Sequence, residues 1–392
     1  MNLSDKLTKV IQKSIEEKQV AGVSLLIQKD GEEICFLAEG MADKEAEKLM
    51  ERDTIFRLYS QTKPVCAVAA MILMERGELD LSKNVSDFLP GFSNQVVWED
   101  GKNRPVKREM QVQDLLRMTS GLYYPDDTCE AGRQAAKVFE KIDERLLGDN
   151  PMTTIEIANA LGKCSLGFEP ASSWNYSTSA DVLGAVIEVV TGMTLGEFME
   201  KEIFAPLGMK DTAFWVPEEK QERLAKTYEM VKDGEEAKLI LYQGNHLGIQ
   251  NAMHRNPAFQ SGGAGLASTL DDYMRFAKML LNGGEYEGIR ILSEETVKYL
   301  TQGELLDKQQ NAFEEKWWLS GHTYANLMRV CQNPGKACML AREGEYGWDG
   351  WLGMYFANFP KENMTILMGM QKKDSGTWEL TRKLRNIILS NL

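Results

Sequence analysis

Residues 59–77 read YSQTKPVCAVAAMILMERG. The run after Pro64 is rich in alanine, methionine and leucine, shows no alternation typical of a strand, and ends at Gly77. These features predict a largely buried helix with a glycine stop. Ser60 and Lys63 form the only S-x-x-K in the chain, and if the helix begins near Ser60 the two lie one turn apart on one face.

This pair has two interpretations. Ser60 could simply cap a helix, with Lys63 in solvent. Alternatively, Ser60 is a nucleophile: burial against the apolar helix would lower the pKa of Lys63 and let it act as a base, and the Ser60 amide would lie at a helix start, where negative charge is favoured. The tetrapeptide alone leaves both open.

The bulk composition limits the class of protein. A length of 392 residues favours two lobes. The net charge of −13 disfavours nucleic-acid binding, and no apolar run is long enough to span a membrane. The six cysteines lack metal-ligand spacing and the N-terminal residues lack a secretory pattern, so we predict reduced cysteines and a cytoplasmic location, the alternative being a removed export signal. Neither a metal nor an organic cofactor is predicted.

Strand-like segments occur at both ends of the chain. Apolar segments 22–28 and 33–40 flank an Asp-Gly turn, and segments 354–359 and 364–370 flank a Pro-Lys-Glu-Asn turn. Amphipathic helices are expected near residues 3–15 and 380–388, whereas the middle is mostly helical with an inserted hairpin or lid near 226–260. We therefore predict an α/β fold of the α+β type. An antiparallel sheet flanked by helices would comprise residues 1–78 and 310–392, and a mostly helical lobe residues 79–309.

Several segments, in this order, resemble the serine β-lactamase and penicillin-binding-protein superfamily. They are DTIFRLYSQTKPVCAVAAMILMERGELDLSKNVSDFLPGF, LLRMTSGL, WNYSTSADVLGAVIEVVTG, SGGAGLASTLDDYMRFAKMLLNGG and YGWDGWLGMYFANFP. The resemblance is strongest to the class C-like branch, which includes family VIII esterases, D-aminopeptidases and acyltransferases. It implies a β-lactamase/transpeptidase-like fold, with Ser60 as nucleophile and Lys63 as its base.

The second motif of this family supplies a tyrosine, and two candidates exist. Tyr324, in YAN, matches the usual letters but lies in a strand-like stretch late in the chain. Tyr176, in YST, follows Trp174 and precedes a helix, as the resemblance predicts, so Tyr176 is preferred as the proton relay or phenolate. Thr178 then stands where asparagine is usual, which weakens the case for binding an amide or lactam.

The third motif is Lys-Thr-Gly in lactamases, and no such triplet occurs here. Residues 246–248 (HLG) imitate a variant, but Trp348-Asp349-Gly350 fits better because a strand follows. The resemblance makes the Trp351 amide the second oxyanion donor beside Ser60. A cation that would pair with a substrate carboxylate is missing, and Asp349 would repel such a carboxylate if it faces the pocket.

Aromatic residues then suggest an apolar substrate pocket, made by Trp348, Trp351, Tyr123 and Tyr124. The other predicted substrate-binding residues are Asp349, Gly350 and Thr178. Gly262 and Gly263 could border the cleft or equally well form a tight turn. The three histidines are expected at the surface or in loops. The predicted function is a serine hydrolase that acts through an acyl-enzyme on a small ester. The alternatives are a D-amino-acid amidase or peptidase, a weak β-lactamase, an acyltransferase and a non-catalytic binder. The expected partner is a small-molecule ester or amide, and the oligomeric state stays open.

Overall fold

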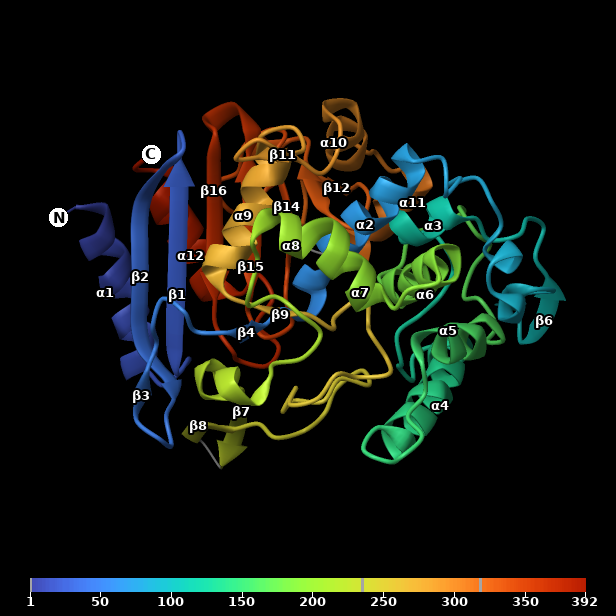
Figure 1. Cartoon of the computed structure of the whole chain (residues 1–392), viewed down its shortest axis with the longest axis horizontal. Coiled ribbons are helices and arrows are strands. Elements are labelled where there is room, and N and C mark those ends of the chain that lie inside the picture. Colours follow the sequence, from blue (N-terminus) through green and yellow to red (C-terminus); the bar gives the residue numbers. More distant parts are fainter. Residues whose placement is uncertain (1, 234–235, 317–318) are drawn as a thin grey trace.

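An eight-stranded antiparallel sheet forms one side of the molecule (Figure 1). The computed structural model describes residues 2–233, 236–316 and 319–392. In spatial order the strands are β12 (His322–Tyr324), β13 (Arg329–Cys331), β14 (Tyr346–Asp349), β15 (Tyr355–Phe359), β16 (Met364–Gly369), β1 (Gly22–Lys29), β2 (Glu32–Asp43) and β3 (Lys48–Leu49). Both ends of the chain contribute strands to this sheet, so the predicted fold class is confirmed.

The position of β1 inside the sheet explains why its sequence lacks polar alternation. It pairs with β16 on one edge and β2 on the other, with Leu26 opposite Leu367. Val23, Leu25 and Ile27 point to one face of the sheet, and Leu26 points to the other. Because both faces are covered, successive side chains are all buried and the strand reads as a continuous apolar run.

The two terminal helices cover one face of the sheet. They are α1 (Leu3–Glu16), which begins at an Asn2 capping box, and α12 (Glu379–Leu389). Leu7 and Ile11 of α1 and Leu384 of α12 pack in one core with the β1 side chains of that face. Helix α9 (Leu270–Leu281) packs on β15 and β16, and its side chains belong to the second, larger core with Leu26.

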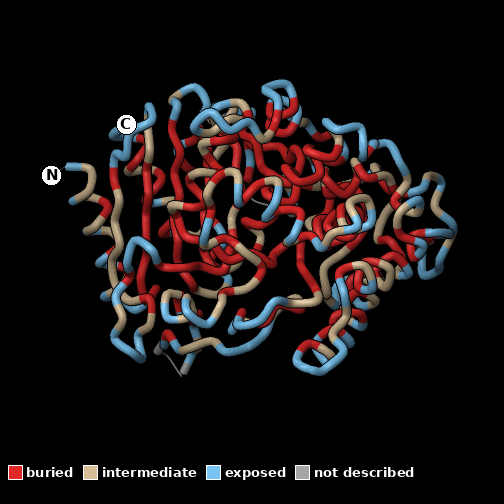
Figure 2. The backbone as a smooth tube through the Cα atoms, in the orientation of Figure 1, coloured by how far each residue is buried: buried red, intermediate tan, exposed pale blue. Residues whose placement is uncertain are grey.

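The rest of the chain is mostly helical. Its helices are α2 (Lys63–Glu75), α3 (Val112–Leu116), α4 (Glu130–Arg145), α5 (Thr154–Gly162), α6 (Ser179–Thr191), α7 (Leu195–Met199), α8 (Ala205–Leu207), α10 (Glu294–Thr301) and α11 (Asp307–Lys316). Short strand pairs are β4 (Phe56–Arg57) with β9 (Ala267–Ser268), β5 (Val96–Glu99) with β6 (Lys102–Pro105), and β10 (Glu285–Tyr286) with β11 (Ile289–Arg290). Figure 2 shows burial concentrated in the sheet and the helices next to it, with exposure along the outer loops.

The segment 226–260 contains a hairpin of β7 (Tyr228–Asp233) and β8 (Glu236–Leu241). The Tyr228 amide donates to the carbonyl oxygen of Gln371, so the hairpin is tied to the segment after β16. The chain that follows, residues 242–260, brings the His246 ring to 6.1 Å from the Tyr59 ring, measured between centroids. All six cysteines are free thiols. Within the described part of the chain, no single helix is long and apolar enough to cross a membrane.

Candidate active site

Ser60 lies in a 3-10 turn, Tyr59–Thr62, that leads directly into α2. Tyr59 before it has φ +44°, in the left-handed region that is unfavourable for a bulky side chain. Hydrogen bonds hold this turn on both sides: the Leu58 amide donates to Leu266 O at 2.8 Å, and the Leu266 amide donates to Thr62 Oγ1 at 3.1 Å. The contact between β4 and β9 therefore fixes a strained turn with Ser60 at its tip.

Lys63 is completely buried at the first turn of α2. Its Nζ donates to Ser60 Oγ at 3.2 Å, to Tyr124 Oη at 3.1 Å and to Gly263 O at 2.8 Å. Burial lowers the pKa of Lys63 to about 7, although Asp181 opposes the shift. A substantial neutral fraction therefore exists near neutral pH, and neutral lysine can accept a proton from the serine.

A buried carboxylate supports this arrangement from behind. Asp181 of α6 accepts hydrogen bonds from the Ser261 hydroxyl and, at 3.1 Å, from the Gly263 amide. The Gly263 carbonyl in turn accepts the bond from Lys63. Asp181 thus fixes the short glycine segment that orients the lysine.

Tyr176 approaches Ser60 from the loop before α6. Its phenol hydrogen-bonds with the Ser60 hydroxyl and accepts a bond from Trp348 Nε1 at 3.1 Å. Burial raises the pKa of Tyr176 far above its usual value, so the neutral phenol is present at neutral pH. Lys63 Nζ lies 4.6 Å from the centroid of the Tyr176 ring. Tyr176, Lys63 and Ser60 are thus brought together.

The end of β14 lies beside the Ser60 turn. A Cβ on Gly350 would come within 2.3 Å of Leu58 O, so only glycine allows this approach. The Gly350 amide donates to Met354 O. Among the described residues, no backbone carbonyl accepts a hydrogen bond from the Ser60 or the Trp351 amide. Both amides are therefore candidates for binding an oxyanion.

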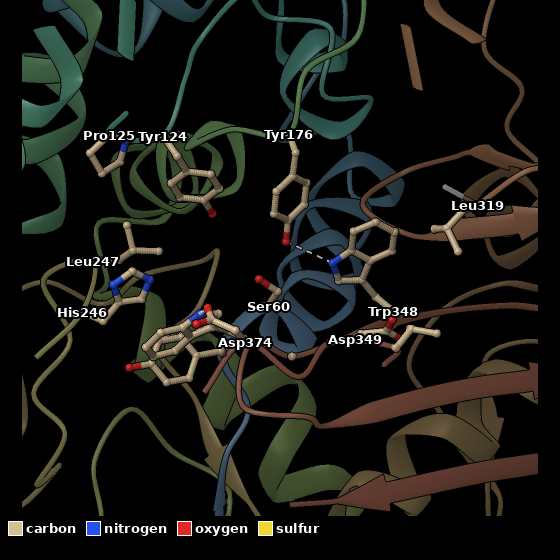
Figure 3. Close-up of a pocket in the computed structure, with 15 residues that line it drawn as sticks. Ser60, Tyr124, Pro125, Tyr176, His246, Leu247, Leu319, Trp348, Asp349 and Asp374 are labelled. Atoms are coloured by element: carbon tan, nitrogen blue, oxygen red, sulfur yellow. Dashed lines mark hydrogen bonds between the residues drawn. The ribbon is translucent and has the colours of Figure 1, made fainter. Parts of the chain in front are cut away.

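A cavity of about 460 Å³ opens over Ser60 (Figure 3). Its walls are mainly aromatic and apolar, and no lysine or arginine occurs among the described residues that line it. The lining residues are Tyr59, Ser60, Tyr124, Pro125, Tyr176, His246, Leu247, Leu319, Trp348, Asp349, Gly350, Trp351, Asp374, Gly376 and Thr377. In the described chain no three His, Cys, Asp or Glu side chains are grouped so that they could hold a metal.

Two predicted pocket residues lie elsewhere. Tyr123 is not among the described lining residues, because its ring packs against Phe168 with centroids 6.4 Å apart. Thr178 is fully buried at the N-cap of α6. The other tyrosine candidate, Tyr324, is buried behind the pocket, where its ring packs edge-on against Trp348 at 5.1 Å. Tyr124, expected only to bind substrate, also contacts Lys63.

His246 and Tyr59 are pocket residues that the sequence did not identify. The His246 ring stacks on Trp351 with centroids 4.0 Å apart, and the Tyr59 ring meets Trp351 edge-on at 5.0 Å. Burial lowers the pKa of His246 to about 4, so it is neutral at pH 7. The expectation that the histidines occupy surface or loop positions is wrong for His322, which is buried in β12. In the sequence, the His-Leu-Gly letters at 246–248 were the signal that could have identified His246. Its place in the cavity depends on the path of the folded chain, which brings that loop back to the pocket.

Comparisons with known proteins identify the family of the chain. Esterase EstB of Burkholderia gladioli is 33% identical over 283 residues, which cover 70% of this chain and 69% of the esterase. Protein Rv1367c of Mycobacterium tuberculosis is 31% identical over 85% of this chain and 81% of its own. Among solved structures, EstCE1, described as a hydrolase with promiscuous acyltransferase activity, has a TM-score of 0.81 at 25% identity and 98% coverage of both chains. The sequence model of the Beta-lactamase family matches residues 7–389, and the chain belongs to that family.

Proposed function

We propose that this protein is a serine hydrolase that cleaves small, uncharged esters through an acyl-enzyme. The observation that carries the proposal is the contact between Lys63 Nζ and Ser60 Oγ at 3.2 Å, with the lysine completely buried and its pKa lowered to about 7. If Ser60 only capped a helix and Lys63 lay in solvent, the contact between Lys63 Nζ and Ser60 Oγ would not be expected. The similarity to esterase EstB and EstCE1 supports the same reaction class.

In the proposed mechanism, Ser60 Oγ attacks the ester carbonyl while neutral Lys63 takes the hydroxyl proton. The amides of Ser60 and Trp351 stabilise the oxyanion. The proton then passes through the Tyr176 phenol, which Trp348 Nε1 orients, to the departing alcohol. Water attacks the acyl-enzyme in the second half of the reaction and restores Ser60.

The absence of lysine and arginine among the described lining residues favours a neutral substrate. Penicillins and D-Ala-D-Ala peptides carry a carboxylate that would find no exposed cation there. The proposed substrate is thus a small ester with apolar acyl and alcohol groups. A cytoplasmic location, consistent with six free thiols, is part of the proposal, and cell fractionation would test it.

The test is intact-protein mass and turnover after mixing with p-nitrophenyl butyrate, with a penicillin in parallel. Wild type should turn over the ester or carry a butyryl adduct. The Ser60→Ala variant should do neither, and Ser390→Ala, which removes an exposed serine, should behave as wild type. Activity that survives in Ser60→Ala would overturn the proposed nucleophile, and a stable penicilloyl adduct would favour a penicillin-binding role.

Acyl transfer is a second candidate, because the aromatic walls offer apolar surface to an alcohol acceptor as well as to an acyl group. Added butanol should then form butyl butyrate at the expense of butyrate. If the release of butyrate stays the same at every butanol concentration tested, the reaction is hydrolysis and not acyl transfer.

A further inference from the structure

An arginine lies directly behind the cavity wall. Arg329 is opposite Gly347 in the register of β13 and β14. Asp349 lies two residues beyond Gly347 and therefore points to the same face of β14. The backbone at Gly347 is crowded, since a Cβ there would come within 2.0 Å of Phe356 O. With no side chain at Gly347, the Arg329 side chain can extend along this face toward Asp349.

The guanidinium of Arg329 is held from several sides. Its Nη1 donates to Asp349 Oδ1 at 2.6 Å, and its Nη2 donates to Phe356 O at 3.1 Å. It also lies 5.0 Å from the centroid of the Tyr355 ring. The Arg329 side chain is 2% exposed and the Asp349 side chain is 15% exposed. The cation is therefore fixed in place, and only its carboxylate partner reaches the cavity.

Asp349 and Trp348 line the cavity (Figure 3). Arg329 is not among the described lining residues, so Asp349 lies between this cation and the substrate space. An arginine stays protonated at all physiological pH values, so the charge behind the wall is permanent. If the carboxylate is removed, the buried guanidinium loses its counter-ion and becomes a strong site for another carboxylate.

We propose that the Asp349 carboxylate occupies the position beside Arg329 that a substrate carboxylate would otherwise take. The Arg329–Asp349 pair therefore makes the enzyme reject carboxylate-bearing esters. The buried Arg329 guanidinium is a latent site for such a carboxylate, which becomes available when the Asp349 carboxylate is removed. This inference rests on the proposed ester hydrolysis for its effect on specificity. The carboxylate site itself depends only on the geometry of the pair. Specificity of this kind comes from a repulsive element built against the wrong substrate.

The first test compares matched esters in wild type, Asp349→Asn, and Asp349→Asn combined with Arg329→Met. One pair is p-nitrophenyl hexanoate and p-nitrophenyl hydrogen adipate, which differ by a terminal carboxylate on the acyl side. The other is the methyl ester and the free acid of meta-butyryloxybenzoate, which differ on the alcohol side. Wild type should prefer the neutral member of each pair.

The preference is the ratio of kcat/KM for the neutral ester to kcat/KM for the charged ester. Asp349→Asn should reduce this ratio at least about tenfold for one pair, as expected for a charge-assisted hydrogen bond. The double variant should lose that gain because it lacks the cation. An unchanged preference in Asp349→Asn for both pairs, or a gain that survives without Arg329, would overturn the inference.

The second test needs no turnover. Asp349→Gly opens a space of carboxylate size in front of Arg329, so sodium formate should raise its unfolding midpoint above that in sodium chloride of equal ionic strength. Wild type and Asp349→Gly combined with Arg329→Met should show no such difference. If Asp349→Gly is largely unfolded alone, formate should restore its folded signal. Because this result does not depend on catalysis, it separates a failure of the carboxylate site from a failure of the proposed hydrolysis.

Discussion

At the scale of single residues, the proposed mechanism makes the rate of acylation depend on the neutral fraction of Lys63. Its pKa is lowered to about 7 by burial, so it is protonated and inactive as a base below that pH and neutral above it. We expect kcat/KM for p-nitrophenyl butyrate to rise through about pH 7 and then level off. The pKa of Tyr176 lies far above neutrality, so the phenol should not limit the alkaline side of that range.

The measurement is a pH profile of kcat/KM from about pH 5 to 9, corrected for spontaneous hydrolysis. Lys63→Met should lose most activity at every pH. Lys298→Met, which removes a half-exposed lysine, should keep the wild-type profile. A wild-type profile that is flat across neutrality would refute the assignment of Lys63 as the base.

At the scale of the element, the end of β14 must approach the Ser60 turn closely. A Cβ at Gly350 would lie 2.3 Å from Leu58 O, and that atom belongs to the backbone, so one of the two segments has to move. Gly350→Ala should displace the Trp351 amide and lower kcat/KM at least about a hundredfold, the usual cost of one lost oxyanion donor.

The matched control is Gly148→Ala, because a Cβ there meets only Arg145 O at 3.5 Å, an ordinary contact. It should leave kcat/KM unchanged. Urea unfolding of both variants would show whether the folds persist. Full activity in Gly350→Ala would mean that the Trp351 amide is not an oxyanion donor.

The elements also show which parts were predictable. The hairpin at Asp30-Gly31 and the helix after Pro64 depend on local signals, so their sequences identify them. Ser60 and Lys63 could be predicted from the sequence for the same reason, because one helical turn places them together. His246 and Asp374 reach the cavity only through the path of long loops, which no periodic pattern encodes. Tyr123 was misplaced because neighbouring loop residues point in different directions, and only packing against Phe168 decides which one enters the pocket.

At the scale of the whole molecule, a buried ion pair joins the last helix to the sheet. Arg385 of α12 is fully buried, and its Nη2 donates to Glu345 Oε1 at 2.9 Å. Removing one partner leaves a buried charge without its counter-ion. Arg385→Met should therefore lower the free energy of unfolding by about 3–5 kcal/mol.

The control on the same helix is Lys383→Met, which breaks an exposed pair with Glu379 and should cost less than about 1 kcal/mol. Urea denaturation of the two variants gives the comparison. Equal losses would contradict the assignment of the Arg385 pair as a structural link between α12 and the sheet.

The pairing of β1 with β16 has a consequence for how the chain is made. Leu26 emerges from the ribosome long before its partner Leu367. Until then β1 has only β2 beside it, and one apolar edge is unprotected against other nascent chains. Contacts between such distant residues are formed slowly, and the sheet cannot be completed before β16 has been synthesised. A chaperone that shields the apolar strand β1 during this interval would therefore protect the nascent chain from wrong pairing.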